Sequence, residues 1–189
     1  MCKFEKDDMK IIESHKSFTE EEYFLFEEKS EVRHELINGN LYEMSGISIF
    51  HNDIVGKLYV LLYTLLKGTT WKITLENFRV KTPDKNFFCP DISVCYPEVE
   101  KYFSEKPVLI VEVLSDTTRK YNLTDKFIQY QKIETLSYYL CIEPEQQVMI
   151  FYFKQDDGEW MTDTLTKNEQ VILLPRLNIS FTVKDIYQP

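Results

Sequence analysis

The segment Pro107–Ser115 (PVLIVEVLS) constrains the fold most, because it places one carboxylate, Glu112, inside an otherwise apolar run. A continuous apolar run of this kind predicts a central β-strand that is covered on both faces. Burial of an ionised carboxylate costs several kcal/mol unless the group is paired or binds a metal ion. Misfit buried acids concentrate at functional sites, whereas the structural alternatives are a buried salt bridge or a protonated carboxyl group. Glu112 is therefore the first candidate site residue.

A second acid, Asp91, stands at the start of another predicted strand. Pro90 cannot donate a ladder hydrogen bond, so it marks the entrance of that strand. Side-chain alternation places Ile92 and Val94 on one face and turns Asp91 toward the other. A Pro-Asp pair alone is equally typical of a plain turn, so Asp91 gains its meaning from Glu112. If the two strands are neighbours, the two carboxylates converge.

Converging carboxylates without an obvious cationic partner predict a site for a hard divalent cation. Mg²⁺ takes oxygen ligands in octahedral geometry and keeps several waters, so Asp91, Glu112 and one backbone carbonyl, that of Val113, suffice as ligands. Bound Mg²⁺ (or Mn²⁺) would lower the pKa of a water and neutralise charge that develops on a phosphate.

Two further charged residues could complete this site. Glu35 lies where the chain turns from polar to apolar, at the head of a predicted hairpin. Lys126 lies in a predicted helix and shares a face with Tyr130 at the i, i+4 spacing. A lysine there could reach a scissile phosphate or the attacking water. Without the two strand acids, each of these charges is more typical of a solvated surface.

Periodicity and turn signals predict the remaining elements. Thr19 and Glu22 form a capping box for a helix over 20–30, and Asn38-Gly39 predicts a type I′ turn in a hairpin over 36–42. The other expected elements are helices over 51–67 and 123–132, the latter with Asn122 as N-cap, and strands over 71–75, 78–82, 91–96, 108–114, 138–142, 148–154 and 160–165. This order predicts one α/β domain over 17–189, a mixed β-sheet flanked by helices, after a flexible arm over 1–16.

The charge balance bears on partners and on the compartment. The chain has 31 acidic and 22 basic residues and a net charge of −9, which disfavours a sequence-blind DNA-binding protein but not a nuclease whose carboxylates await a metal ion. The four cysteines show no CxxC spacing, which disfavours a zinc site. The longest apolar stretch, 54–66, is too short to span a bilayer, and no segment resembles a signal peptide. We expect a cytoplasmic protein without membrane association.

Five segments together resemble the Uma-two (Uma2) family of restriction endonucleases, a branch of the PD-(D/E)XK nuclease superfamily. The segments are Arg33–Gly39, His51 at a helix start, Pro90–Val94, Val111–Ser115 with Thr118, and Lys126 with Tyr130. The resemblance runs from about Phe18 to Tyr152. It implies a restriction-endonuclease-like core, Mg²⁺ dependence and phosphodiester hydrolysis, and the family often forms homodimers.

By position, the resemblance makes Asp91 and Glu112 the metal ligands. It makes Glu35 an additional acid that orients the metal ion or its water, and Lys126 the lysine that stabilises the developing negative charge from a helix. The usual superfamily lysine, two residues after the second acid, would fall at Leu114, and the family pattern also lacks it.

Other departures from the family pattern remove negative charge. Asn38, Asn40 and Asn122 stand where acids are usual, although asparagine suits a type I′ turn and an N-cap as well as aspartate does. A Ser-Asp-Thr-Thr sequence also replaces the usual Ser-Pro-Ser-Thr at 115–118. His51, at a helix start, is more typical of a capping or packing residue than of a general base.

The main hypothesis is a Mg²⁺-dependent endonuclease that hydrolyses DNA. The competing hypothesis is a non-catalytic nucleic-acid-binding or protein-binding module that keeps the fold with a weakened site; the acidic charge and the three asparagines favour it slightly. A third is an unrelated structural protein in which Glu112 is merely paired. A homodimer, and a partner protein that supplies DNA affinity, stay open at this point.

Overall fold

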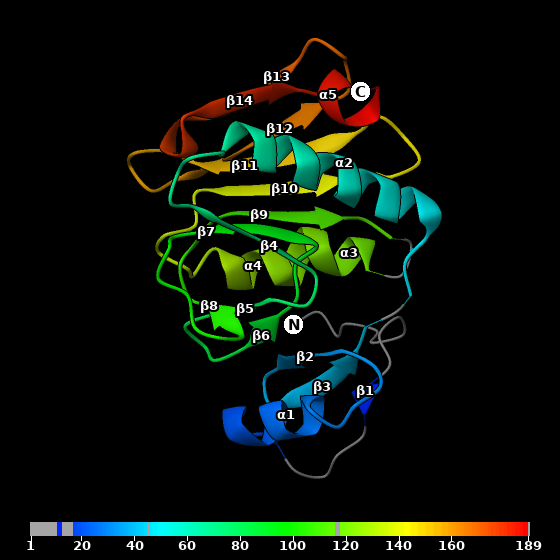
Figure 1. Cartoon of the computed structure of the whole chain (residues 1–189), viewed down its shortest axis with the longest axis vertical. Coiled ribbons are helices and arrows are strands. Elements are labelled where there is room, and N and C mark those ends of the chain that lie inside the picture. Colours follow the sequence, from blue (N-terminus) through cyan, green and yellow to red (C-terminus); the bar gives the residue numbers. More distant parts are fainter. Residues whose placement is uncertain (1–10, 13–16, 45, 116–117, 189) are drawn as a thin grey trace, which may run out of the picture.

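The structure is a computed structural model that describes residues 11–12, 17–44, 46–115 and 118–188. Its main layer is a six-stranded sheet in the order β12-β11-β10-β9-β7-β4 (Figure 1). Its strands are β4 (Lys72–Leu75), β7 (Ile92–Cys95), β9 (Pro107–Val113), β10 (Tyr138–Ile142), β11 (Met149–Lys154) and β12 (Trp160–Leu165). Because β9 pairs in parallel with β10 and antiparallel with β7, the sheet is mixed, which confirms the predicted fold class.

Helices cover both faces of this sheet. Alternate residues of β9 belong to two separate cores: Val111 packs in the cluster that contains α2 (Ile49–Leu65), and Ile110 packs in the cluster that contains Tyr130 of α4 (Phe127–Tyr130). All residues of β9 are buried. The prediction of a central strand covered on both sides is therefore confirmed.

A second six-stranded sheet has the order β1-β3-β2-β6-β5-β8. Its strands are β1 (Ile11–Ile12), β2 (His34–Ile37), β3 (Asn40–Glu43), β5 (Arg79–Lys81), β6 (Phe87–Phe88) and β8 (Phe103–Ser104). Helix α1 (Glu20–Glu27) lies beside β2 and β3 at the end of the molecule opposite α5 (Lys184–Tyr187). A two-stranded sheet of β13 (Val171–Leu174) and β14 (Ile179–Thr182), joined by η2 (Pro175–Leu177), contributes to the α2 core.

The local signals at the N-terminal end of the domain act as expected. Thr19 Oγ1 accepts a hydrogen bond from Glu22 N–H, and the Glu22 side chain accepts one from Thr19 N–H, so the capping box is present. Asn38 and Gly39 take positive φ angles of 50° and 76°, as a type I′ hairpin turn requires. This turn sets the register of β2 and β3 and so fixes the place of Glu35 in β2.

Two local predictions need correction. The second helix begins at α3 (Arg119–Tyr121) rather than at residue 123, and it continues through a π-helical segment, η1 (Asn122–Lys126), into α4. Asn122 is thus a buried residue within the helix and not its N-cap. Of the arm predicted as flexible, residues 1–10 and 13–16 lie outside the described part, whereas β1 pairs with β3. No described helix is long and apolar enough to cross a membrane.

Candidate functional site

A cavity of about 640 Å³ opens beside the ends of β7 and β9. It is lined by all five predicted site residues, which come from β2, the entrance of β7, β9 and the π-helical segment: Glu35, Asp91, Glu112, Val113 and Lys126. His51, from the first turn of α2, also lines it. Residues from five distant parts of the chain therefore meet in one space.

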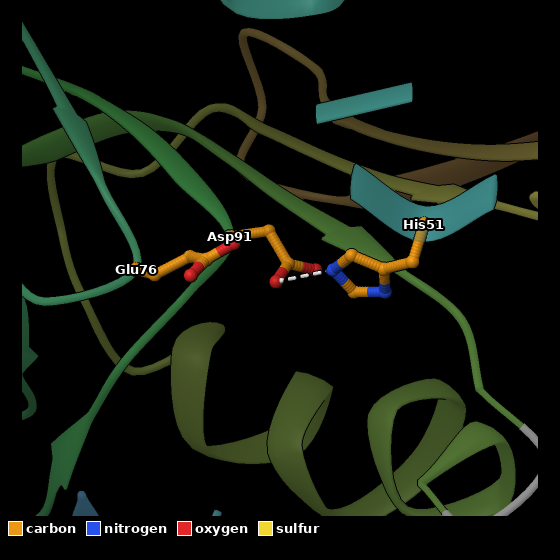
Figure 2. A group of neighbouring side chains, drawn as sticks. All are labelled: His51, Glu76 and Asp91. Carbon is orange, nitrogen blue, oxygen red and sulfur yellow. Dashed lines mark hydrogen bonds and ion pairs between the residues drawn. The ribbon is translucent and has the colours of Figure 1, made fainter. Parts of the chain in front are cut away.

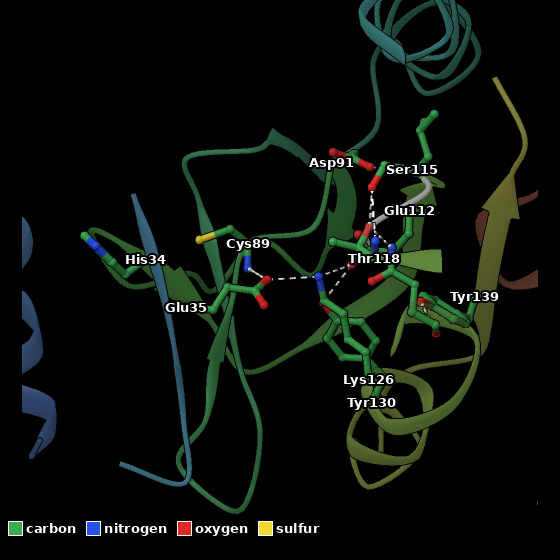
Figure 3. Close-up of polar contacts among 12 residues, drawn as sticks. His34, Glu35, Cys89, Asp91, Glu112, Ser115, Thr118, Lys126, Tyr130 and Tyr139 are labelled. Atoms are coloured by element: carbon green, nitrogen blue, oxygen red, sulfur yellow. Dashed lines mark hydrogen bonds and ion pairs between the residues drawn. The ribbon is translucent and has the colours of Figure 1, made fainter. Parts of the chain in front are cut away.

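Lys126 joins two of the acids. Its Nζ lies 2.9 Å from Glu35 Oε1 and 2.8 Å from Glu112 Oε1, and Figure 3 shows the ammonium group between the two carboxylates. Tyr130, four residues further along the helix, donates a hydrogen bond of 3.1 Å to the same oxygen of Glu112. The predicted shared face of Lys126 and Tyr130 is thus directed at Glu112. Glu35 Oε1 also accepts a hydrogen bond of 3.0 Å from Cys89 N–H, which fixes its orientation.

These contacts are buried, and their electrostatics follow from that. Burial is the main cause that raises the pKa of Glu112, to about 8; the charges of Asp91 and Glu35 raise it further, while Lys126 opposes them. Burial disfavours the charged form of Lys126, but Glu112 and Glu35 hold its pKa well above the usual value. The lysine is therefore a fixed positive charge, and Glu112 is an acid whose protonated form is favoured by burial.

Asp91 is held next to Glu112 by the sheet. Strands β7 and β9 pair Ile92 with Val111, and one further step in this antiparallel register sets Asp91 beside Glu112. Asp91 Oδ2 accepts a hydrogen bond of 2.6 Å from Val113 N–H, and Oδ1 lies 3.0 Å from His51 Nε2. The condition for convergence of the two acids, that the two strands are neighbours, is therefore met.

A second group of donors surrounds Asp91. His51, Glu76 and Asp91 each offer one ligand atom, and these atoms all lie within 4.8 Å of one another (Figure 2). Burial lowers the pKa of His51, but the hydrogen bond and charge of Asp91, together with the charges of Glu76 and Glu112, raise it overall. Burial, and then the charge of Asp91, raise the pKa of Glu76.

Sequence reasoning missed Glu76 and did not predict the contact between His51 and Asp91. Glu76 follows β4, and the β4–β7 register pairs Leu75 with Ile92, so the next residues on each strand, Glu76 and Asp91, are adjacent. Glu76 N–H donates a hydrogen bond of 3.2 Å to the Asp91 carbonyl oxygen. An acid directly after a strand was the only signal, and it has meaning only once the strand partner is known.

The donor chemistry fits a divalent cation. Carboxylate oxygens suit Mg²⁺ and Mn²⁺, and an imidazole nitrogen suits transition-metal ions. A ligand distance of about 2.1 Å places neighbouring ligand atoms of one ion roughly 3–4 Å apart, so donors within 4.8 Å need only a small closure. Asp91 and Glu112 sit beside a lysine that could contact an anionic group. The arrangement can hold a cation and direct one positive side chain at a phosphate.

Comparison with known proteins gives a consistent result. The model of the Uma2 family, described as "Putative restriction endonuclease", matches residues 20–184. An uncharacterised protein of Synechocystis sp., slr1290, is 33% identical over 172 residues, covering 89% of this chain and 90% of the relative. A second Synechocystis protein, sll1609, is 26% identical over 170 residues, covering 86% and 96%. The crystal structure of a "putative nuclease belonging to DUF820" from Anabaena variabilis has the same fold, with a TM-score of 0.72 at 19% identity, covering 87% of this chain and 94% of that one.

Proposed function

The chain belongs to the Uma2 family of the restriction-endonuclease type, and on that premise we propose that it hydrolyses DNA phosphodiester bonds by metal-assisted attack of water. The observation that supports this most is the convergence of Glu35, Asp91, Glu112 and Lys126 on one cavity. The substrate is DNA, the ion is Mg²⁺ or Mn²⁺, and the reaction takes place in the cytoplasm.

Asp91, Glu112 and the Val113 carbonyl would hold the cation. The polar contacts of the Glu112 side chain with Lys126 and Tyr130 both use Oε1, which leaves Oε2 without a partner among the described residues. When bound, the ion supplies a Lewis acid that lowers the pKa of a water and neutralises charge on the phosphate. Asp91 reaches the same position from the neighbouring strand.

Lys126 stabilises the negative charge that develops on the phosphate. A lysine ammonium group has three donors, and the structure uses two of them, toward Glu35 and Glu112. The third donor is available for a phosphate oxygen. Glu35 contacts Lys126 and the Cys89 backbone, so its contacts favour a role in positioning the lysine over the predicted role of orienting the metal ion or its water.

The acidity of the cavity is the reason that the cation is needed. Its lining includes six acids, Glu35, Glu43, Asp91, Glu112, Glu143 and Glu145, against Lys126 and Arg119. Lys126 is already engaged by Glu35 and Glu112. Without a cation, a phosphodiester would meet a net negative surface. The net charge of −9 has the same effect at longer range.

The second candidate function, a binding module with a weakened site, is favoured by one observation. Asn122 lines the cavity at a position where the family usually has an acid. Asn38 and Asn40 do not line it, and they lie in and beside the hairpin turn. Only one of the three substitutions therefore removes a charge at the site, which supports the enzyme over the module.

The proposed function is tested by incubating the protein with supercoiled and linear DNA in Mg²⁺ or Mn²⁺, beside Asp91→Asn and Glu112→Gln. We expect nicking by the wild type and a loss of at least about 100-fold in each variant, the order of effect seen when a group that stabilises developing charge is removed. Glu145→Gln, which removes one exposed charge from the same cavity, is the matched control and should retain activity. Equal nicking by all four proteins would indicate a contaminant and overturn the proposal.

A further inference from the structure

The proposed catalytic position uses only one side of the Asp91 carboxylate. Glu112 and Val113 lie on the β9 side of Asp91, whereas His51 and Glu76 approach it from α2 and from the end of β4. Figure 2 shows the Asp91 carboxylate between the Glu76 and His51 side chains. The second donor group thus shares one residue with the first and consists otherwise of different residues.

The donor atoms of this second group lie slightly further apart than the ligand atoms of a single bound ion would. Its three ligand atoms lie within 4.8 Å of one another, and His51 and Asp91 are buried while Glu76 is half-buried. Two contacts hold the group together: Glu76 N–H donates to the Asp91 carbonyl oxygen, and His51 Nε2 lies 3.0 Å from Asp91 Oδ1. The donors therefore have little freedom to separate.

The basic group beside Glu76 is the imidazole of His51, and no lysine or arginine pairs with Glu76 among the described residues. Among the described residues, Glu76 takes part in no ion pair, in contrast to Glu35 and Glu112, which share Lys126. Two carboxylates, Glu76 and Asp91, therefore face each other with only an imidazole beside them. A divalent cation would bring two positive charges to this group, more than the one that a protonated His51 supplies.

The donor set also distinguishes the two positions. The first offers only oxygen atoms, which suit Mg²⁺ as well as Mn²⁺. The second includes the nitrogen of His51, and imidazole ligands favour first-row transition-metal ions over Mg²⁺. A shared carboxylate holds two ions about 3.5–4 Å apart in two-metal phosphodiesterase centres, where the second ion stabilises the leaving oxygen.

We propose that His51, Glu76 and Asp91 form a second cation position, which shares Asp91 with the Asp91–Glu112 position and takes a transition-metal ion such as Mn²⁺ in preference to Mg²⁺. This inference rests on the proposed function, because it adds an ion to the same centre. It gives Glu76 a role as a ligand.

The test is Mn²⁺ binding, measured by the EPR signal of free Mn²⁺ with and without a large excess of Mg²⁺. We expect about two Mn²⁺ per chain without Mg²⁺ and about one when Mg²⁺ competes for the oxygen-only position. Glu76→Gln should lower the affinity for the Mn²⁺ that remains bound in excess Mg²⁺ by at least about tenfold. Glu112→Gln should keep this Mn²⁺ and lose the other one. In pulsed EPR, the retained Mn²⁺ should couple to an imidazole nitrogen, and His51→Leu should abolish this coupling.

The matched control is Glu145→Gln, which removes one negative charge from the cavity without removing a proposed ligand. It should bind both ions as the wild type does. Glu76 belongs to no hydrophobic core cluster, so its variant should fold, and near-ultraviolet circular dichroism verifies this. Wild-type Mn²⁺ binding by Glu76→Gln, or a retained ion without nitrogen coupling, would overturn the inference. Wild-type binding by Glu112→Gln with loss in Glu76→Gln would instead contradict the ligand set of the proposed function.

Discussion

Lys126 Nζ lies 2.8 Å from Glu112 Oε1, and both side chains are only 5% exposed. The acid that the sequence places inside an apolar strand is thus paired with a lysine from a helix on one face of the sheet. A buried ion pair alone would account for Glu112 structurally. It does not account for Asp91 and Glu76, which meet beside Glu112 without a lysine or arginine of their own among the described ion pairs. The pair is therefore one part of a larger charged centre.

Replacement of Lys126 should show both its structural role, as the partner of Glu112, and its role in the charged centre. Lys126→Met leaves Glu112 and Glu35 buried without a cation, and removal of one partner of a buried pair costs about 3–5 kcal/mol of unfolding free energy. We expect a loss in this range in urea denaturation, together with loss of DNA cleavage. The double variant Lys126→Met/Glu112→Gln should be more stable than Lys126→Met, because it removes one of the two buried acids that the single variant leaves without a cation. Equal stability of the single and double variants would contradict a direct interaction.

Metal affinity should rise with pH. The pKa of Glu112 is raised to about 8, chiefly by burial, and a carboxyl group must lose its proton to bind a metal ion. Its raised pKa means that the proton is still bound at neutral pH in the metal-free protein and is lost as the pH approaches 8. Calorimetric Mg²⁺ titrations should show affinity that increases between about pH 6 and 8, by up to roughly tenfold per pH unit, and then levels off.

Two variants control this pH dependence. Glu112→Gln should bind weakly and lose most of the dependence, whereas Glu145→Gln should keep it. The same dependence in Glu112→Gln as in the wild type would assign the proton to another group.

The hairpin that carries Glu35 gives a stability prediction. Gly39 has a φ of +76°, and a Cβ there would collide with the Ser17 side chain, whereas Gly158 has a φ of +91° and open space around it. Gly158→Ala should cost about 1–2 kcal/mol of unfolding free energy, because it forces a left-handed conformation on alanine. Gly39→Ala should cost about 1–3 kcal/mol more, because it adds the collision. Equal losses in thermal or urea unfolding would show that Ser17 moves away freely.

Several parts of the fold and site could be predicted because their signals are local. The apolar run around Glu112, the Asn38-Gly39 turn and the spacing of Lys126 and Tyr130 each depend on neighbouring residues alone. The family predicted from five segments is confirmed by the family model and by a relative with 33% identity. The residues singled out by these signals, Glu112, Lys126 and others, are the ones that the structure brings to one cavity.

The features that could not be predicted depend on which strands pair. Glu76 is adjacent to Asp91 only because β4 pairs with β7, a pairing that the sequence does not encode locally. Asn122 has the composition of an N-cap, but the helix begins earlier, at Arg119, without a side-chain cap. Tertiary contacts hold the segment that follows, as in the hydrogen bond from Tyr139 to the Asn122 carbonyl oxygen.

The asparagine at position 122 allows a last prediction. Its side chain is buried and lines the cavity, so Asn122→Asp would add a carboxylate to a centre that already holds Asp91, Glu112 and Glu35. Without metal, we expect the variant to lose about 1–3 kcal/mol of unfolding free energy, because a buried acid without a dedicated partner is costly. Saturating Mg²⁺ or Mn²⁺ should recover part of this loss, since a cation in the cavity offsets the added charge and binding to the native state stabilises it. Urea denaturation with and without metal measures both values. A loss of the same size in both conditions would show that the ion does not interact with the charge at residue 122. Asn122 would then have only a structural role.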